Sequence, residues 1–155
     1  MTRRSERGLA KAETDRAASA ATHNADAWLT AYIDIVNANM PPNLNPDAIA
    51  SCYAEDCVHF QPLRELPGGP LQGREAERRF FAAFDAHWAD WTHIEVSRMT
   101  DRNRAVWEGC AQGIHKKTGK FVKMPIVFFL EFDEEGKIKQ ERTYVDNGLV
   151  EEQIR

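Results

Sequence analysis

The chain has 155 residues, of which 43% are hydrophobic and 28% are charged, and its formal net charge is −4. This length suits one domain that buries enough apolar surface to fold without a disulfide or a structural metal. The acidic balance argues against a nucleic-acid partner, and no apolar run approaches the ~20 residues that a membrane span requires.

The first 22 residues differ in composition from the rest of the chain. They contain six alanines, five basic residues, three acidic residues and no aromatic side chain. We expect residues 1–22 to form a disordered or frayed tail, and residues 23–155 to form a single domain. No apolar signal-peptide core follows the arginines, and the three cysteines lack framework spacing, so we expect a cytoplasmic protein.

Two helices are predicted before the first strand. Apolar residues at helical spacing predict the first, from His23 to about Met40, with Asn24 as its N-cap. Its apolar stripe contains Trp28, Leu29, Tyr32, Ile33, Val36 and Met40. Pro41-Pro42 ends this helix, and a second short helix is expected from Asn45 to about Tyr53.

The middle of the chain alternates between regular and irregular segments. Cys57–Gln61 is expected to be a short strand. The proline- and glycine-rich loop Pro62–Gly73 is expected to lie over the molecule as a flap. A third helix is predicted from about Arg74 to Trp88, with Glu75 and Glu77 near the positive end of its dipole.

Four consecutive strands follow, and together with the helices they define the expected fold. They are predicted at Thr92–Thr100, Arg104–His115, Phe121–Phe132 and Lys137–Asp146. Helices followed by a run of strands indicate an α+β domain. We expect a curved antiparallel sheet wrapped around about three helices, forming a cone with an internal pocket.

The last strand carries an unusual mixture of side chains. Strict alternation places one set on the same face: Ile138, Gln140, Arg142, Tyr144 and Asp146. A dry core would make the charged members costly, whereas solvent would suit the apolar members poorly. A partly enclosed pocket accommodates both kinds, which makes Asp146 the first candidate catalytic residue.

Three segments resemble the nuclear-transport-factor-2-like superfamily, and within it the SnoaL-like polyketide cyclase branch. They read Cys-Tyr-Ala-Glu-Asp-Cys-Val-His-Phe (52–60), Leu-Gln-Gly-Arg-Glu-Ala (71–76) and Gly-Lys-Ile-Lys-Gln-Glu-Arg-Thr-Tyr-Val-Asp (136–146). The resemblance implies that Asp146 lies inside the cone as a general base. In the related limonene-epoxide-hydrolase-like enzymes, an arginine and a second acid lie on the central strand, where this chain has Gly109 and Ala111.

Two groups of candidate site residues follow. Asp146 would be the base, with His59 and Tyr144 polarising or protonating a substrate oxygen. Trp107, Tyr32, Arg142 and Trp28 would contact the substrate, and ordinary core packing or structural ion pairing remains the alternative for these four. Asp146 also has a second interpretation, as the start of the turn Asp146-Asn147-Gly148.

The expected partners are a small hydrophobic molecule and a second copy of the chain. Alternation in the strands would leave Val127, Phe129 and Val145 on the outer face of the sheet, and exposed apolar patches of this kind usually mark an interface. A homodimer through this face is also implied by the resemblance. The histidines show no metal-ligand spacing and no nucleotide-binding motif is present, so no metal or cofactor is expected.

These observations favour a small, cofactor-independent enzyme acting on a hydrophobic, oxygenated metabolite. The reaction would be an isomerisation, a cyclisation or a dehydration that begins with proton abstraction. A noncatalytic binding or interaction module on the same scaffold is the first alternative, and an epoxide-hydrolase-like enzyme is the second.

Overall fold

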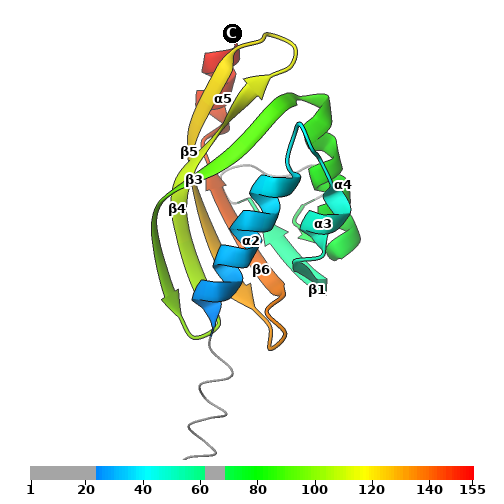
Figure 1. Cartoon of the computed structure of the whole chain (residues 1–155), viewed down its shortest axis with the longest axis vertical. Helices are drawn as coiled ribbons and strands as arrows, with labels where there is room; N and C mark the ends of the chain where they lie inside the picture. Colours follow the sequence, from blue (N-terminus) through cyan, green and yellow to red (C-terminus); the bar gives the residue numbers. More distant parts are fainter. Residues whose placement is uncertain (1–23, 62–68) are drawn as a thin grey trace, which may run out of the picture.

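The computed structural model describes residues 24–61 and 69–155. Within these ranges the chain forms an α+β domain, in which a curved, unclosed six-stranded sheet is packed against helices (Figure 1). The predicted tail and most of the predicted flap, residues 62–68, lie outside the described residues. No helix in the described ranges is both long enough and apolar enough to cross a membrane.

Four α-helices are present in the described residues, one more than predicted. They are α2 (Ala25–Asn39), α3 (Pro46–Ala50), α4 (Arg74–Ala82) and α5 (Asn147–Ile154), and a 3₁₀ helix, η1 (Ala83–Ala86), follows α4. The apolar stripe predicted for α2 is buried, except for the partly buried Trp28. Asn45 caps α3 by accepting a hydrogen bond from the Ala48 amide at 3.2 Å, whereas Asn24 makes no such bond at α2.

The strands are β1 (Tyr53–Phe60), β2 (Leu71–Gln72), β3 (Trp88–Asp101), β4 (Arg104–His115), β5 (Phe121–Phe132) and β6 (Ile138–Val145). Their order in the sheet is β2-β1-β6-β5-β4-β3. Every neighbouring pair is antiparallel except β1 and β6, which run parallel. This pairing places the end of β1 beside the middle of β6, with His59 opposite Glu141.

A one-residue irregularity decides which side chains of β6 face the interior. Phe132 pairs with Ile138, but Glu131 pairs with Gln140, so Lys139 is an extra residue in β6. Such a bulge restarts the alternation of side chains between the two faces. Ile138 and Glu141 are consequently both buried.

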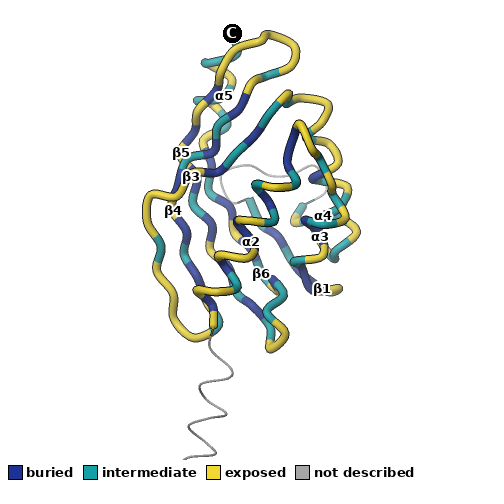
Figure 2. The backbone as a smooth tube through the Cα atoms, viewed as in Figure 1, coloured by how far each residue is buried: buried dark blue, intermediate teal, exposed yellow. Residues whose placement is uncertain are grey.

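The expected face assignment for β6 is therefore wrong beyond Ile138. The buried set is Glu141, Thr143 and Val145, whereas Arg142 and Asp146 are exposed and Tyr144 is half-buried. Val145, which was expected on the outer face, lies inside. Along β5 the prediction is confirmed, because Ile126, Phe128 and Leu130 are buried and Phe129 is exposed (Figure 2).

Candidate functional site

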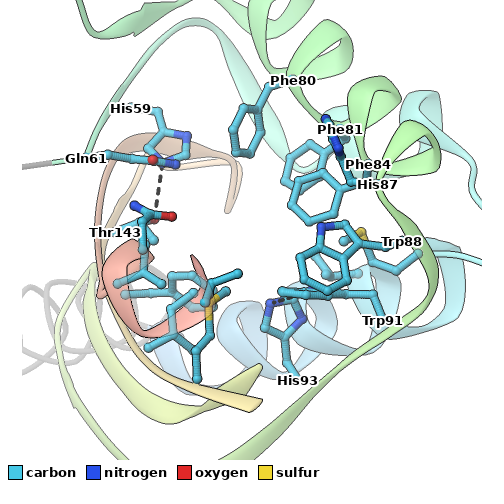
Figure 3. A pocket seen from close by; sticks show the side chains of 18 of the residues that line it. His59, Gln61, Phe80, Phe81, Phe84, His87, Trp88, Trp91, His93 and Thr143 are labelled. Atoms are coloured by element: carbon cyan, nitrogen blue, oxygen red, sulfur yellow. Dashed lines mark hydrogen bonds between the residues drawn. The ribbon is translucent and has the colours of Figure 1, made fainter. Parts of the chain in front are cut away.

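A cavity of about 440 Å³ lies between the sheet and the helices (Figure 3). One of its walls is aromatic, formed by Phe80, Phe81, Phe84, Trp88 and Trp91. Further lining side chains are non-aromatic and apolar, among them Met124, Ile126, Val145, Val150 and Ile154. Such a space suits a small and largely apolar molecule, because apolar contact supplies most of the binding energy in sites of this kind.

Behind one part of this cavity, six side chains form a hydrogen-bonded series that we call the buried network: Glu77, His59, Thr143, Glu141, Tyr53 and Tyr32. His59 Nδ1 lies 3.2 Å from Glu77 Oε2, and His59 Nε2 lies 3.1 Å from Thr143 Oγ1. All six residues are buried, and His59 and Glu77 are only 2% and 0% exposed. His59, Thr143 and Tyr32 line the cavity, and the two carboxylates lie behind them.

The donors and acceptors of the buried network follow a consistent direction. Thr143 donates its hydroxyl proton to Glu141 Oε1, and Tyr53 donates its own to Glu141 Oε2, each at 2.6 Å. Because each hydroxyl has a single proton, Thr143 must accept from His59 Nε2 and Tyr53 must accept from Tyr32. In this arrangement His59 Nε2 carries a proton and points toward Thr143, with Glu141 Oε1 3.7 Å from the same nitrogen.

Three elements assemble the buried network. The parallel pairing of β1 with β6 sets His59 next to Glu141, and the β6 bulge turns Thr143 and Glu141 inward. Glu77 projects from α4 on the same side as Phe80, whose ring meets His59 edge-on at 5.6 Å between centroids. Tyr32 comes from α2 and packs at right angles to Tyr53, with 5.9 Å between the rings.

Burial and charge act in opposite directions on the pKa of His59. Burial alone would lower it, but the carboxylate of Glu141 and the hydrogen bond and charge of Glu77 together raise the pKa above its usual 6.5. The pKa of Glu77 is also raised, chiefly by burial, although His59 partly counters this. The pair therefore retains a proton at a pH where a solvated glutamate and histidine would have released theirs.

A second histidine, His93, lies in the cavity wall in a very different environment. Burial lowers the pKa of His93 to about 4, so its ring is neutral at pH 7. Its Nε2 accepts a hydrogen bond from Trp91 Nε1 at 3.4 Å. Its Nδ1 has no hydrogen-bond partner among the described residues.

The environment of His93 predicts a specific acid sensitivity. Between about pH 6.5 and about pH 4, His93 binds fewer protons in the native chain than in the unfolded chain. The stability contributed by neutral His93 is therefore lost as the pH falls through this window. The loss amounts to about 3 kcal/mol of unfolding free energy. Urea unfolding at pH 7 and pH 4 is expected to show a smaller acid loss in His93→Phe than in the wild type. Equal losses in the two proteins would contradict the assignment.

The structure brings only two of the predicted site residues to the cavity. His59 and Tyr32 line it, as expected for site residues. Asp146 is exposed and caps α5, where its Oδ1 accepts from the Leu149 amide at 3.2 Å. Tyr144 packs on Phe129 on the outer side of the sheet, with 5.6 Å between ring centroids. The expected interior position is thus wrong for Asp146, Tyr144 and Arg142, because the Lys139 bulge reverses the faces of β6.

The two predicted tryptophans belong to the core and do not line the cavity. Trp107 is fully buried, stacks on Phe128 at 5.1 Å, and donates from Nε1 to Glu95 at 2.8 Å. A Cβ added to Gly109 would lie 2.0 Å from the Trp107 ring, so this ring already fills the hollow that the small residue leaves. Trp28 packs against Phe132 at 5.6 Å. Both tryptophans therefore fit the core-packing interpretation.

Sequence reasoning missed Glu77, Glu141, Tyr53, Thr143 and His93. The helix dipole is one reason for an acid at Glu77, but this residue also precedes Phe80 and Phe81 by three and four residues. That spacing places all three on one helix face, which is a signal for a buried carboxylate. The inward positions of Glu141 and Thr143 depend on the bulge at Lys139, and no residue pattern in β6 predicts that bulge.

Comparison with known proteins identifies the family. Residues 29–141 match the family model of the SnoaL-like domain. The chain therefore belongs to the SnoaL-like family within the NTF2-like superfamily, as the resemblance predicted. No curated protein sequence matches the chain significantly.

Solved structures with low sequence identity share the fold. The phenazine biosynthesis-related protein PhzB2 from Pseudomonas aeruginosa is 14% identical, with a TM-score of 0.66, covering 84% of this chain and 80% of its own. A putative isomerase from Bacillus subtilis is 18% identical, with a TM-score of 0.66 and coverage of 83% and 91%. SalBIII, described as an epoxide hydrolase/cyclase-like enzyme in pyran ring formation in polyether salinomycin, is 19% identical, with a TM-score of 0.65 and coverage of 78% and 89%.

Proposed function

We propose that this protein is a small enzyme of the isomerase, cyclase or dehydratase type that moves protons on a hydrophobic, oxygenated molecule held in the cavity. The observation that carries the proposal is the position of His59, which borders the apolar cavity and is backed by two buried carboxylates. Perturbed ionisable groups in a cavity of this kind are typical of acid–base sites. His59 takes the role that the sequence suggested for Asp146.

His59 has the properties of a residue that both accepts and donates a proton. To act as a base, His59 first releases the proton that Nε2 donates to Thr143, and Nε2 then takes a proton from the substrate. The resulting imidazolium is stabilised by Glu141 at 3.7 Å and by Glu77 at 3.2 Å. Nδ1 stays bound to Glu77, which fixes the orientation of the ring. A raised pKa makes the imidazole a stronger base and keeps the proton available for return to the product near neutral pH.

This proton transfer requires neither a metal nor an organic cofactor. The epoxide-hydrolase alternative gains no support from β4, because the inward positions that would hold its arginine and second acid are Gly109 and Ala111, both buried. The binding-module alternative would make the buried network purely structural. The proposed enzyme and the binding module differ in whether the protein accelerates a proton transfer.

Deuterium exchange tests the proposed chemistry without knowledge of the natural substrate. In D₂O, the protein is expected to accelerate exchange of the protons on the carbon next to the carbonyl of 1-tetralone or 2-tetralone. Proton NMR measures the rate at which their signals disappear. Free imidazole at the same concentration is the control for catalysis by an unorganised base. Exchange no faster than this control with both ketones would refute the proposal and favour the binding-module alternative.

We also propose that the protein forms a homodimer through the outer face of the sheet. Met99, Val106 and Phe129 form a row across β3, β4 and β5 on this face, because Met99 pairs with Val106 and Val106 with Phe129. Met99 is 69% exposed and Phe129 is 41% exposed. Exposed apolar side chains in a continuous row favour burial against a second copy.

The dimer predicts a mass twice that of the chain in sedimentation or light scattering at micromolar concentration. Phe129→Lys is expected to shift the population to monomer, since it replaces an exposed apolar member of the row with a charge. Lys123→Glu also changes the charge of an exposed β5 residue but lies outside the row, so it serves as the matched control. A wild-type monomer at these concentrations would contradict the proposed dimer.

A further inference from the structure

Strand β5 continues beyond the end of its neighbour β6, and α5 covers part of the edge that β6 leaves open. The last pair between the two strands joins Val145 to Ile126, whereas β5 begins at Phe121. At Lys123, Gln153 of α5 takes the place of the missing strand. Its Oε1 accepts from the Lys123 amide and its Nε2 donates to the Lys123 carbonyl, each at 2.9 Å. One side-chain amide therefore satisfies both backbone groups of this residue.

The other attachments of α5 are weak. The helix has eight residues and none of them is buried, although Val150 and Ile154 are half-buried. In the part of the chain that the structure describes, the two bonds between Gln153 and Lys123 are the hydrogen bonds that join α5 to another element. The cap supplied by Asp146 is internal to the segment. A segment with so little buried surface opens at a lower free energy than the fold as a whole.

Helix α5 also forms part of the rim of the cavity. Asn147, Val150 and Ile154 line the cavity and are half-buried, whereas a deeper lining residue such as Tyr32 is buried. Figure 1 shows α5 along β5 at one end of the sheet, beside the hairpin between β4 and β5. Movement of α5 away from β5 would widen the opening to the space in front of His59 without breaking a strand pair.

We propose that α5 is a lid on the cavity and that Gln153 is its latch, so that a small apolar ligand enters and leaves when Gln153 releases Lys123. This inference rests on the proposed function, because it takes the cavity as the ligand site. The hinge is the junction of β6 with α5 at Asn147-Gly148, where the glycine gives the backbone the freedom that rotation of a helix requires. When the lid is closed, Val150 and Ile154 cover the ligand and exclude water from it.

Amide hydrogen exchange followed by NMR tests the latch without a ligand. The Lys123 amide is expected to be protected in the wild type, because Gln153 accepts its hydrogen bond. This protection is expected to fall roughly tenfold or more in Gln153→Ala. The amide of Val122, which pairs with Gly113 of β4, is the internal reference and is expected to keep its protection. Equal protection of Lys123 in the two proteins would overturn the latch.

The binding kinetics of 1-tetralone test the lid itself. Trp88 lines the cavity, so stopped-flow tryptophan fluorescence gives the association and dissociation rate constants. Both constants are expected to rise together in Gln153→Ala, by roughly threefold to tenfold, because the loss of the latch increases the open population. The dissociation constant is expected to change much less, since the same opening serves entry and exit. Glu152→Ala alters an exposed residue of the same helix and is the matched control, with wild-type rates expected.

The possible outcomes separate the lid from the proposed chemistry. Faster dissociation of 1-tetralone with unchanged association in Gln153→Ala would show that α5 is a fixed wall, and two unchanged rates would show that the ligand enters elsewhere. Either result would overturn the lid. Rates that rise together in a protein that does not accelerate deuterium exchange would leave the lid standing and refute only the catalytic proposal. No binding to the wild type up to the solubility limit of the ketone would overturn both proposals.

Discussion

The His59→Gln variant is expected to lose ketone exchange activity by a factor of roughly 10² to 10⁴, the usual contribution of a positioned general acid–base group. Glutamine retains an amide that can hydrogen-bond to Glu77 or Thr143, but it cannot take up a proton near neutral pH. The loss is expected in the rate at saturating ketone, with binding largely retained. Initial rates at several ketone concentrations, followed by NMR, separate these two quantities.

The pH profile of the wild type supplies a second readout for His59. The base form must be neutral, and its pKa is raised above 6.5, so exchange should increase with pH through a value above 6.5 and then level off. Asp146→Asn is the matched control, since asparagine also caps helices and the residue is exposed. A large loss in Asp146→Asn with full activity in His59→Gln would restore Asp146 as the base.

The Glu141→Ala variant is expected to lose about 3–5 kcal/mol of unfolding free energy, as is typical when one partner of a buried charged pair is removed. Glu141 accepts hydrogen bonds from both Thr143 and Tyr53 and faces His59. Its removal leaves two buried hydroxyl donors unpaired and His59 without its nearest stabilising charge on that side. Chemical denaturation at pH 7 measures the loss.

Two further variants define what the loss in Glu141→Ala means. Glu152→Ala alters an exposed glutamate on α5 and is expected to change stability by less than about 0.5 kcal/mol. Glu141→Gln keeps an acceptor oxygen, so it is expected to be milder in stability while lowering the pKa of His59. A change of less than about 1 kcal/mol in Glu141→Ala would show that the buried network does not hold β1 to β6.

The fold was largely predictable because local patterns in the sequence are strong. Helical spacing from Trp28 to Met40 and alternation along β4 and β5 each bury one face, and the structure confirms those faces. The sequence did not predict α5, because Asp146-Asn147-Gly148 resembles a turn and the segment that follows is short. It also did not predict the parallel pairing of β1 with β6, which depends on tertiary packing.

The candidate site was only partly predictable, for a specific geometric reason. His59 lies on a strand whose alternation is regular at its end, so its inward position could be anticipated. The face of Asp146 was inferred by counting from Ile138, and the extra residue at Lys139 makes that count fail. The nearby histidine of β3, His93, carries no sequence signal, since its importance comes from Trp91 and from burial.

The bulge at Lys139 also bears on how this scaffold can diversify. Removing that one residue would leave Glu141 and Thr143 facing the interior, because Ile138 and Glu141 would then lie two positions apart in a regular strand. If β6 instead kept all its residues but paired without the bulge, Arg142 and Tyr144 would turn toward the cavity, and a cationic and phenolic interior would replace an anionic one. The outline of the domain would stay the same while its internal chemistry changed in a single step.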